Sequence, residues 1–372
     1  MAKRRLAVVA FVLAGIMLAG VALAADDNPT VKWNCASAWD TNNPLLKSDQ
    51  YIAEKVEKIT SGKFSIKVYV AGAMVPAYEV FDAVSSGAFP MGSTALSYQA
   101  GINPAFSLYT SIPLLMSQQD YFNWLYQADG LKLLNEILEK YNIVAFPNTI
   151  FDLESGFRSH KEVKRLEDFK GMKMRVGTLE LQAILQKLGV AFVSLSGGEL
   201  YDAMQRGIID AFEYMTPNID WDMGFHEIAE YWVAPAWYQT AVCYYTLINA
   251  DAWKKLPENY RAILEEVTKA SVIEWSSFMN VQSAMGTKKF LDYGVKVSKA
   301  GEGDETFWPR MEALAKEVLE DFASKNPDYA RVLKSQMDYL KTYTLWKEIT
   351  SPFHSGIIAE NLPEVKDEWL KK

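Results

Sequence analysis

Short apolar segments alternate with amphipathic segments through the first two thirds of the chain. Residue patterns typical of strands occur at 31–36, 64–70, 143–146, 172–176, 191–194 and 209–213. Between them, apolar residues recur at helical spacing at 48–60, 75–84, 120–141, 179–188 and 199–206. This alternation predicts an α/β fold with mainly parallel sheets.

The C-terminal part of the chain has a different pattern. Helical spacing dominates residues 262–290 and 305–349, with a break near Pro327, and a strand is predicted at 295–297. We expect this helical tail either to pack across the α/β core or to reach a partner chain.

The first residues are organised like a secretory signal. Basic residues at 3–5 precede an apolar run over 6–24, which ends in the small-x-small sequence Ala22-Leu23-Ala24. This order predicts a signal peptide over residues 1–24 and an exported mature protein. The alternative is an uncleaved anchor, because the run is just long enough to span a bilayer.

Composition excludes several classes of protein. Hydrophobic residues make up 49% of the 372 residues and charged residues 23%, which is an ordinary globular composition. The formal net charge of −8 argues against a nucleic-acid partner, because phosphate contacts require a basic surface. Aromatic residues reach 13%, enough to fill a large core or to line a pocket for an organic ligand.

Motifs typical of enzymes and of zinc sites are missing from the sequence. His160, His226 and His354 stand apart from one another, and the chain has no HExxH, CxxC, GxSxG or P-loop motif. We expect the two cysteines, Cys35 and Cys243, to be unpaired. These absences favour a binding protein over an enzyme.

Two charged residues lie where predicted strands end. Arg175 belongs to the strand at 172–176 and Glu213 ends the strand at 209–213, and ligands of open α/β sheets bind beyond the carboxyl ends of strands. An arginine there can hold a carboxylate through two parallel hydrogen bonds, and a glutamate can coordinate a hard cation. From the residues alone, a solvated Arg175 and a Glu213 neutralised by a basic neighbour are the alternatives.

Aromatic residues crowd the segment 231–245, which contains two Trp and four Tyr around Pro235. Such a segment fits a pocket wall or a hinge. An inter-domain core is the alternative, and it is the commoner use of such residues.

Three longer segments resemble one family of transport proteins. They are residues 166–175 (LEDFKGMKMR), 198–211 (GELYDAMQRGIIDA) and 249–257 (NADAWKKLP). In this order and spacing they resemble the periplasmic solute-binding subunits of tripartite ATP-independent periplasmic (TRAP) transporters, the DctP family. Residues 72–76 and 104–113 are similar to the branch of that family that binds 2-oxo acids with a metal cation.

The resemblance implies a two-lobed periplasmic binding protein of the Venus-flytrap type, with a long inter-lobe helix and a helical C-terminal tail. We expect residues 28–148 and 241–280 to form lobe I, and residues 149–240 and 281–372 to form lobe II. Closure of the lobes on a small anion would desolvate the arginine clamp and strengthen it. The tail helices imply a possible homodimer contact.

The same resemblance assigns roles to individual residues. Arg175 would clamp the ligand carboxylate. Glu213, the backbone carbonyl of Tyr214 and Gln239 would ligate a calcium or sodium ion that bridges ligand and protein. Tyr214 departs from the branch, where we expect Trp, and this change affects the shape of the pocket rather than the carbonyl ligand.

Four further residues are expected to contact the ligand: Tyr98, Asn148, Asp152 and Trp237. Asp152 stands where we expect a neutral amide. An added carboxylate favours a divalent ion, so this residue predicts Ca²⁺ rather than Na⁺.

The expected function is capture of a 2-oxo monocarboxylate and its delivery to TRAP membrane subunits. An alternative ligand is an aromatic carboxylate such as an indole or phenyl acid, because Trp and Tyr crowd the expected pocket. Two other classes stay open. One is an exported enzyme on an acidic substrate, and the other is a ligand-sensing module for a receptor kinase.

Overall fold

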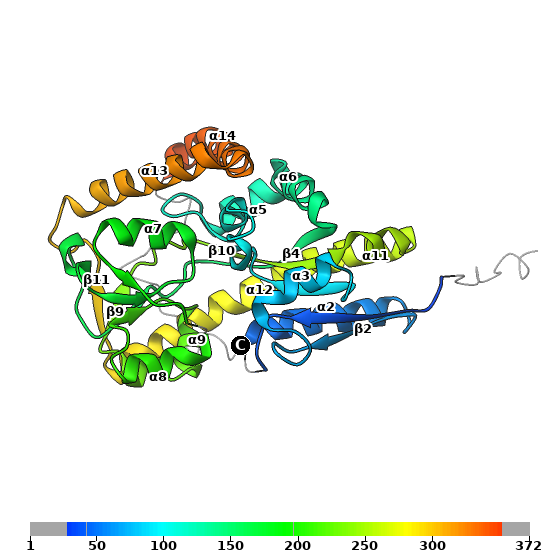
Figure 1. Cartoon of the computed structure of the whole chain (residues 1–372), viewed down its shortest axis with the longest axis horizontal. Helices are drawn as coiled ribbons and strands as arrows, with labels where there is room; N and C mark the ends of the chain where they lie inside the picture. The colour runs from blue at the N-terminus through cyan, green and yellow to red at the C-terminus, as the bar shows by residue number, and fades with distance from the viewer. Residues whose placement is uncertain (1–27, 42, 196, 352–372) are drawn as a thin grey trace, which may run out of the picture.

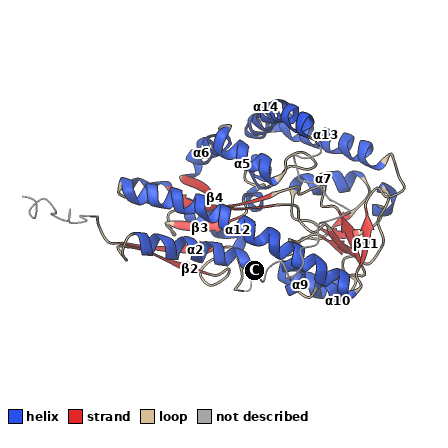
Figure 2. Cartoon of the chain, turned by 180° about the vertical axis from the view of Figure 1, so that it is seen from behind, coloured by secondary structure: helices blue, strands red, loops and turns tan. Residues whose placement is uncertain are grey.

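The computed structural model of the protein describes residues 28–41, 43–195 and 197–351. The predicted signal peptide therefore lies outside the described residues. The described chain forms two β-sheets, each covered by helices and each with its own buried apolar core (Figures 1 and 2). This arrangement is the two-lobed α/β fold that the sequence predicts.

The first sheet has five strands in the order β2-β1-β3-β10-β4. Their bounds are β1 (Val31–Ser37), β2 (Phe64–Tyr69), β3 (Met91–Thr94), β4 (Ile143–Phe151) and β10 (Val242–Asn249). Strand β1 pairs in parallel with β2 and β3, whereas β10 runs antiparallel to both β3 and β4. Strand β10 is buried along its whole length, in keeping with its place inside the sheet.

The second sheet has six shorter strands in the order β11-β9-β5-β8-β6-β7. Their bounds are β5 (Phe157–Ser159), β6 (Lys173–Arg175), β7 (Ala191–Phe192), β8 (Ala211–Phe212), β9 (Tyr231–Ala234) and β11 (Lys296–Lys299). Strand β5 is antiparallel to both of its neighbours. Parallel pairings are therefore in the majority by only five to four, because β5 and β10 enter their sheets from the other lobe and run against the local direction.

The remaining elements are helices. The α-helices are α2 (Pro44–Ile59), α3 (Val80–Ser85), α4 (Ala105–Thr110), α5 (Gln118–Gln127), α6 (Gly130–Leu138), α7 (Leu179–Lys187), α8 (Leu200–Gln205), α9 (Pro217–Asp222), α10 (Phe225–Ile228), α11 (Ala250–Lys255), α12 (Glu258–Tyr293), α13 (Phe307–Lys325) and α14 (Pro327–Thr350). Short 3₁₀ segments are η1 (Ala77–Glu79), η2 (Leu96–Gln99), η3 (Glu139–Tyr141), η4 (Leu166–Phe169) and η5 (Gly197–Glu199).

The chain passes from one sheet to the other three times. Residues 152–156 lead from β4 to β5, and residues 235–241 lead from β9 back to β10. The long helix α12 makes the third passage, packing against β4 and α2 at one end and against α9 at the other (Figure 2). A glycine, Gly286, permits the close approach of α12 to α9, since a Cβ there would come closer than 3.0 Å to the backbone of Asn218.

The C-terminal helices α13 and α14 form a layer across the top of both lobes (Figure 1). Helix α13 packs on α7, and α14 packs on α4, α5 and α6. Buried Glu180 in α7 joins these parts, because its Oε1 accepts hydrogen bonds from Ser107 in α4 and from Tyr329 in α14. The expectation that the tail packs across the core is confirmed.

Two further predictions concern single features. Residues 120–141 form two α-helices rather than one, because Asp129 adopts a left-handed conformation with φ of 61° between α5 and α6. Cys35 and Cys243 are buried and unpaired, as expected. Among the described residues, no helix combines the length and the apolar character needed to cross a membrane.

Candidate functional site

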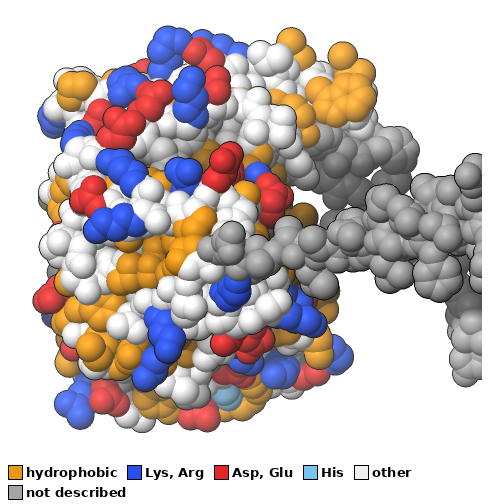
Figure 3. Space-filling view, turned by 90° about the vertical axis from the view of Figure 1, so that its right-hand side faces the viewer, with side chains coloured by type: hydrophobic (Ala, Val, Ile, Leu, Met, Phe, Trp, Pro, Cys, Tyr) orange, Lys and Arg blue, Asp and Glu red, His pale blue; other side chains and the backbone are white. Residues whose placement is uncertain are grey.

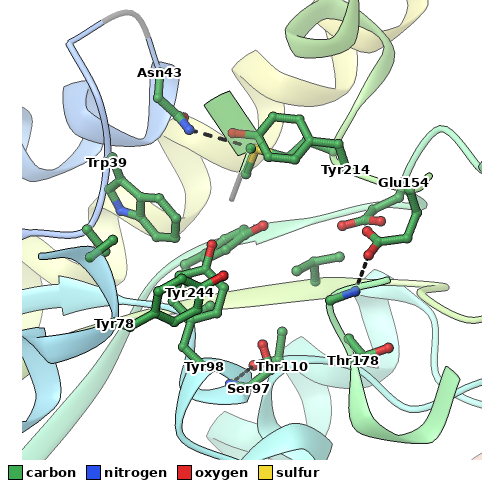
Figure 4. Close-up of a pocket in the computed structure, with 18 of the residues that line it drawn as sticks. Trp39, Asn43, Tyr78, Ser97, Tyr98, Thr110, Glu154, Thr178, Tyr214 and Tyr244 are labelled. Atoms are coloured by element: carbon green, nitrogen blue, oxygen red, sulfur yellow. Dashed lines mark hydrogen bonds between the residues drawn. The ribbon is translucent and has the colours of Figure 1, made fainter. Parts of the chain in front are cut away.

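A cavity of about 270 Å³ lies between the two sheets (Figure 4). Its wall is built largely from residues that follow the carboxyl ends of β1, β2 and β3 in one lobe and of β6 and β8 in the other. Loops at these strand ends are where open α/β sheets place their ligands. The cavity is therefore the candidate functional site.

Arg175, the last residue of β6, is 6% exposed and faces this cavity. Its Nη1 donates to the backbone carbonyl of Glu213 at 2.7 Å and to Oε1 of the same residue at 3.0 Å, and its Nε donates to the carbonyl of Leu195 at 3.1 Å. Although burial opposes its charge, the neighbouring Glu213 raises the pKa of Arg175. The guanidinium is thus a fixed, permanently positive group on the cavity wall.

Glu213, directly after β8, is 2% exposed and holds the arginine in place. Its Oε1 also accepts a hydrogen bond from the backbone N–H of Gly177. Burial raises the pKa of Glu213, against the opposing effects of Arg175 and of that N–H group. The pair presents one positive and one negative side chain to the same space.

Glu154 and Gln239 lie on the two non-helical segments that connect the sheets. Gln239 Nε2 donates to Glu154 Oε1 at 3.0 Å, and the backbone N–H of Glu154 donates to the Gln239 carbonyl at 3.3 Å. Within the described part of the chain, Glu154 Oε2 and Gln239 Oε1 are buried and have no hydrogen-bond partner. Burial and then the nearby Glu213 raise the pKa of Glu154 well above its usual value.

These oxygens fit a hard cation. Leaving two buried acceptors without donors costs free energy, and a metal ion would offset that cost for both, because carboxylate and amide oxygens are ligands that Ca²⁺ and Na⁺ accept. No group of three or more His, Cys, Asp and Glu side chains placed for metal binding occurs in the described residues. A cation here would therefore depend on amide, carbonyl and ligand oxygens as well as on the two carboxylates.

Thr178 adds a hydroxyl beside the arginine. It precedes helix α7, lines the cavity, and its buried Oγ1 has no hydrogen-bond partner among the described residues. The N-terminus of a helix attracts negative charge. Arg175, Thr178 and the start of α7 together favour an anionic group in this corner of the cavity.

Tyr214 and Tyr98 contribute aromatic surface to the cavity. The Tyr214 ring lies against Gly197, where an added Cβ would come closer than 3.0 Å to the ring. The pKa of Tyr214 is raised to about 12, chiefly by burial. The absence of a side chain at position 197 thus allows the Tyr214 ring to lie where it does on the cavity wall.

The structure brings five predicted site residues together on the cavity wall: Tyr98, Arg175, Glu213, Tyr214 and Gln239. It places Asn148, Asp152 and Trp237 elsewhere.

Each of these three has a different environment. Asn148 lies inside the first lobe, where its Nδ2 donates to Ser93 Oγ at 3.1 Å and Asp49 Oδ1 at 3.3 Å. Asp152 is exposed and lines a second cavity, which it shares with Glu154. Trp237 is 2% exposed and packs in the core of the second lobe.

Sequence reasoning missed Glu154 and Thr178. Glu154 follows Asp152 by two residues in the stretch FDLES, and Glu154, not Asp152, lines this cavity. The signal for Thr178 was its place directly before a predicted helix and three residues after Arg175.

Comparison with known proteins identifies the family. Residues 35–325 match the family model of DctP, described as bacterial extracellular solute-binding protein, family 7. The chain is 28% identical over 321 residues to the monocarboxylate 2-oxoacid-binding periplasmic protein of Nostoc sp., covering 86% of this chain and 87% of that protein.

Two solved structures are similar as well. A TRAP periplasmic solute-binding protein from Colwellia psychrerythraea with bound calcium and pyruvate has a TM-score of 0.82 and 28% identity. One from Pseudoalteromonas atlantica with bound sodium and pyruvate has a TM-score of 0.81 and 27% identity. Each match covers 86% of this chain and 97% of the other. The protein belongs to the DctP family of bacterial extracellular solute-binding proteins.

Proposed function

We propose that this protein captures a 2-oxo monocarboxylate together with a metal cation and delivers it to the membrane subunits of a TRAP transporter. The observation that carries the proposal is the pairing, in one buried cavity, of a fixed guanidinium with carboxylate and amide oxygens that lack donors. A 2-oxo acid has the matching groups, because its carboxylate suits the guanidinium and its adjacent oxygens suit a cation.

The residues divide into two sets. Arg175 binds the ligand carboxylate, with Thr178 as a neighbouring hydroxyl donor. Glu213, the Tyr214 carbonyl and Gln239 hold the cation, as the resemblance to the 2-oxo-acid branch implies. When bound, the cation would supply positive charge that offsets the negative charge of Glu213 and of the ligand carboxylate.

Glu154 makes calcium the better ion. With Arg175 positive, Glu154 and Glu213 negative and one monocarboxylate bound, a divalent cation brings the buried site to neutrality, whereas a monovalent cation leaves one negative charge. Uncompensated charge in a buried site is costly. We therefore propose that the carboxylate that favours a divalent ion belongs to Glu154, which is buried, and not to Asp152, which is exposed.

A thermal-shift experiment tests the function. The mature protein is unfolded, stripped of ligand and refolded, and its melting temperature is measured with organic acids in the presence of Ca²⁺ or a chelator. A ligand that binds only the native state raises the melting temperature. We expect a shift with pyruvate and Ca²⁺ that disappears with chelator. If neither pyruvate nor any other 2-oxo acid raised the melting temperature, that result would contradict the proposal.

Membership of the family supports inferences about the cellular location of the protein and about its two lobes. We infer that the protein is exported to the periplasm and that its signal peptide, residues 1–24, is removed. We also infer that residues 28–148 with 241–280, and residues 149–240 with 281–372, act as the two lobes that close on the ligand. The matched family and relatives are solute-binding proteins, which supports binding and transport rather than catalysis.

We propose further that two copies associate through the C-terminal helices. Near the end of α14, Leu345, Trp346 and Ile349 are 60%, 56% and 81% exposed, and apolar side chains gather at the top of the molecule, at the height of α13 and α14 (Figure 3). Apolar surface of this kind favours association. Light scattering should give a dimer for the wild type and a monomer for Trp346→Glu, and a monomeric wild type would contradict this proposal.

A further inference from the structure

The two walls of the cavity differ in chemistry. The second lobe and the crossing segments supply Arg175, Glu213, Glu154 and Gln239. The first lobe adds the exposed Asp40 and the buried Asn43, but its surface toward the cavity is mainly apolar and carries four aromatic rings. In Figure 4 the labelled rings Trp39, Tyr78, Tyr98 and Tyr244 lie together on one side, and Glu154 and Thr178 lie on the other.

The aromatic side chains form a continuous run from the mouth of the cavity to its floor. The rings of Tyr78 and Tyr98 are 4.6 Å apart between centroids, those of Trp39 and Tyr98 are 6.3 Å apart, and those of Trp39 and Tyr244 are 5.1 Å apart. Tyr78 is 49% exposed, whereas Trp39 and Tyr244 are 3% and 4% exposed. A ligand held by the charged wall would therefore project its own side chain along a surface of rings.

Small residues keep this side of the cavity open. Four alanines line the cavity on the same side as the rings: Ala38, Ala71, Ala77 and Ala95. The resulting volume of about 270 Å³ is near the lower end, roughly 300 Å³, of pockets that hold much larger organic molecules. Pyruvate and one cation would leave much of this space, and most of the ring surface, without contact.

We infer that the preferred ligand is a 2-oxo acid with an aryl side chain, such as phenylpyruvate. This inference rests on the proposed function, because the charged wall holds the carboxylate and 2-oxo group by way of the cation. The aryl ring then packs against Trp39, Tyr98 and Tyr244 and above the alanines. Offset and edge-to-face contacts between aromatic rings add to the free energy gained by removing the ring from water.

Calorimetry with the refolded, calcium-loaded protein tests the inference. We compare pyruvate, the branched aliphatic acid 4-methyl-2-oxopentanoate and phenylpyruvate. We expect phenylpyruvate to bind at least about tenfold more tightly than pyruvate. In Ala71→Leu and Ala77→Leu, which place a larger side chain at partly buried positions on the aromatic wall, phenylpyruvate should lose about tenfold in affinity while pyruvate changes little.

Ala73→Leu is the matched control, because Ala73 is exposed in the same turn and does not line the cavity. It should leave both affinities unchanged. The aryl assignment would be overturned if pyruvate bound as tightly as phenylpyruvate, or if 4-methyl-2-oxopentanoate bound more tightly than phenylpyruvate. It would also be overturned if the leucine variants lost affinity equally for pyruvate and phenylpyruvate. Those results would leave the proposed function intact. Binding of none of the three acids, with or without Ca²⁺, would overturn both.

Discussion

Arg175 is held by its neighbours before any ligand arrives. Three hydrogen bonds, to Glu213 and to the Leu195 carbonyl, fix the guanidinium at the end of β6. Fixed groups lose little freedom when they bind, so they contribute more of their interaction energy to affinity. The short strand β6 thus positions the guanidinium that we propose binds the ligand carboxylate.

Arg175→Ala should weaken binding of the carboxylate by at least about 30-fold, because the ligand charge would lose its charge-assisted hydrogen bonds. Arg175→Lys should retain part of the affinity, since it keeps the charge but not the planar fork. Calorimetry measures both, and circular dichroism checks that the variants are folded. Full affinity in folded Arg175→Ala would remove the clamp from the account.

Glu154 and Asp152 offer a matched pair of carboxylates. Glu154 is buried in the cavity, whereas Asp152, two residues earlier, is exposed. Glu154→Gln should reduce the preference for Ca²⁺ over Na⁺ by about tenfold, because it removes one of the two negative charges that favour a divalent ion. Asp152→Asn should leave the preference unchanged. Ligand affinity measured for each variant in Ca²⁺ and in Na⁺ distinguishes the two carboxylates. Equal effects of both substitutions would contradict the proposal that Glu154 favours the divalent ion.

Acid should oppose metal binding at this site. Burial raises the pKa of both Glu154 and Glu213 above the usual value of 4.5, and a cation requires the ionised carboxylates. Calcium affinity should therefore rise as the pH increases through the raised pKa values. The metal-free protein should behave in the opposite way, because its folded state binds these protons more tightly than the unfolded state and loses stability as the pH rises from about 4.5.

Melting curves in chelator and in Ca²⁺, recorded at several pH values, measure both trends. Glu154→Gln should flatten the pH dependence of the metal-free protein. An unchanged pH dependence in that variant would mean that other buried acids, such as Asp49 or Asp220, govern it.

At the scale of elements, the sequence predicted most helices and the order of most strands, because hydrophobic spacing is a local property. The helix predicted at 179–188 is α7, and the strand predicted at 64–70 is β2. Strands β3, β5, β9 and β10 were missed. The first three are only three or four residues long, too short for a pattern, and pairing with distant strands stabilises them. Strand β10 has eight residues, but it is buried on both faces and so lacks the alternation that marks a strand.

In the candidate site too, local patterns could be predicted from the sequence and long-range contacts could not. Arg175 and Glu213 were found because each lies at the end of a local strand pattern. Glu154 was missed because its burial depends on how the segment 152–156 crosses between the sheets and meets Gln239, which is 85 residues away in sequence. Residue spacing alone does not specify a contact of that range.

The turn before α8 positions one wall of the cavity. Gly197 lies against the Tyr214 ring, whereas a Cβ at Gly198 would meet nothing within 4 Å. Gly197→Ala should therefore displace Tyr214 and weaken ligand binding several-fold, at a cost in the range of about 1–3 kcal/mol that is typical of overpacking. Gly198→Ala is the control and should bind normally. Equal affinities for the two variants, measured by calorimetry, would show that the Tyr214 ring does not shape the site.

At the scale of the whole molecule, the site exists only where the two lobes meet. One lobe supplies the guanidinium and Glu213, the other supplies the aromatic wall, and the crossing segments supply Glu154 and Gln239. Helix α12 contacts elements of both lobes, and α13 and α14 together do the same, since α13 packs on α7 and α14 packs on α4, α5 and α6. Ligand, cation and lobe closure are therefore expected to be linked in a single binding equilibrium.

The most direct test of the central claim is calorimetric titration of pyruvate into the refolded protein at a series of free Ca²⁺ concentrations. If the cation bridges ligand and protein, the affinity for pyruvate should rise with Ca²⁺ and be lost in chelator, and pyruvate should raise the affinity for Ca²⁺ by the same factor. An affinity for pyruvate that is the same in chelator and in Ca²⁺ would contradict metal-assisted binding.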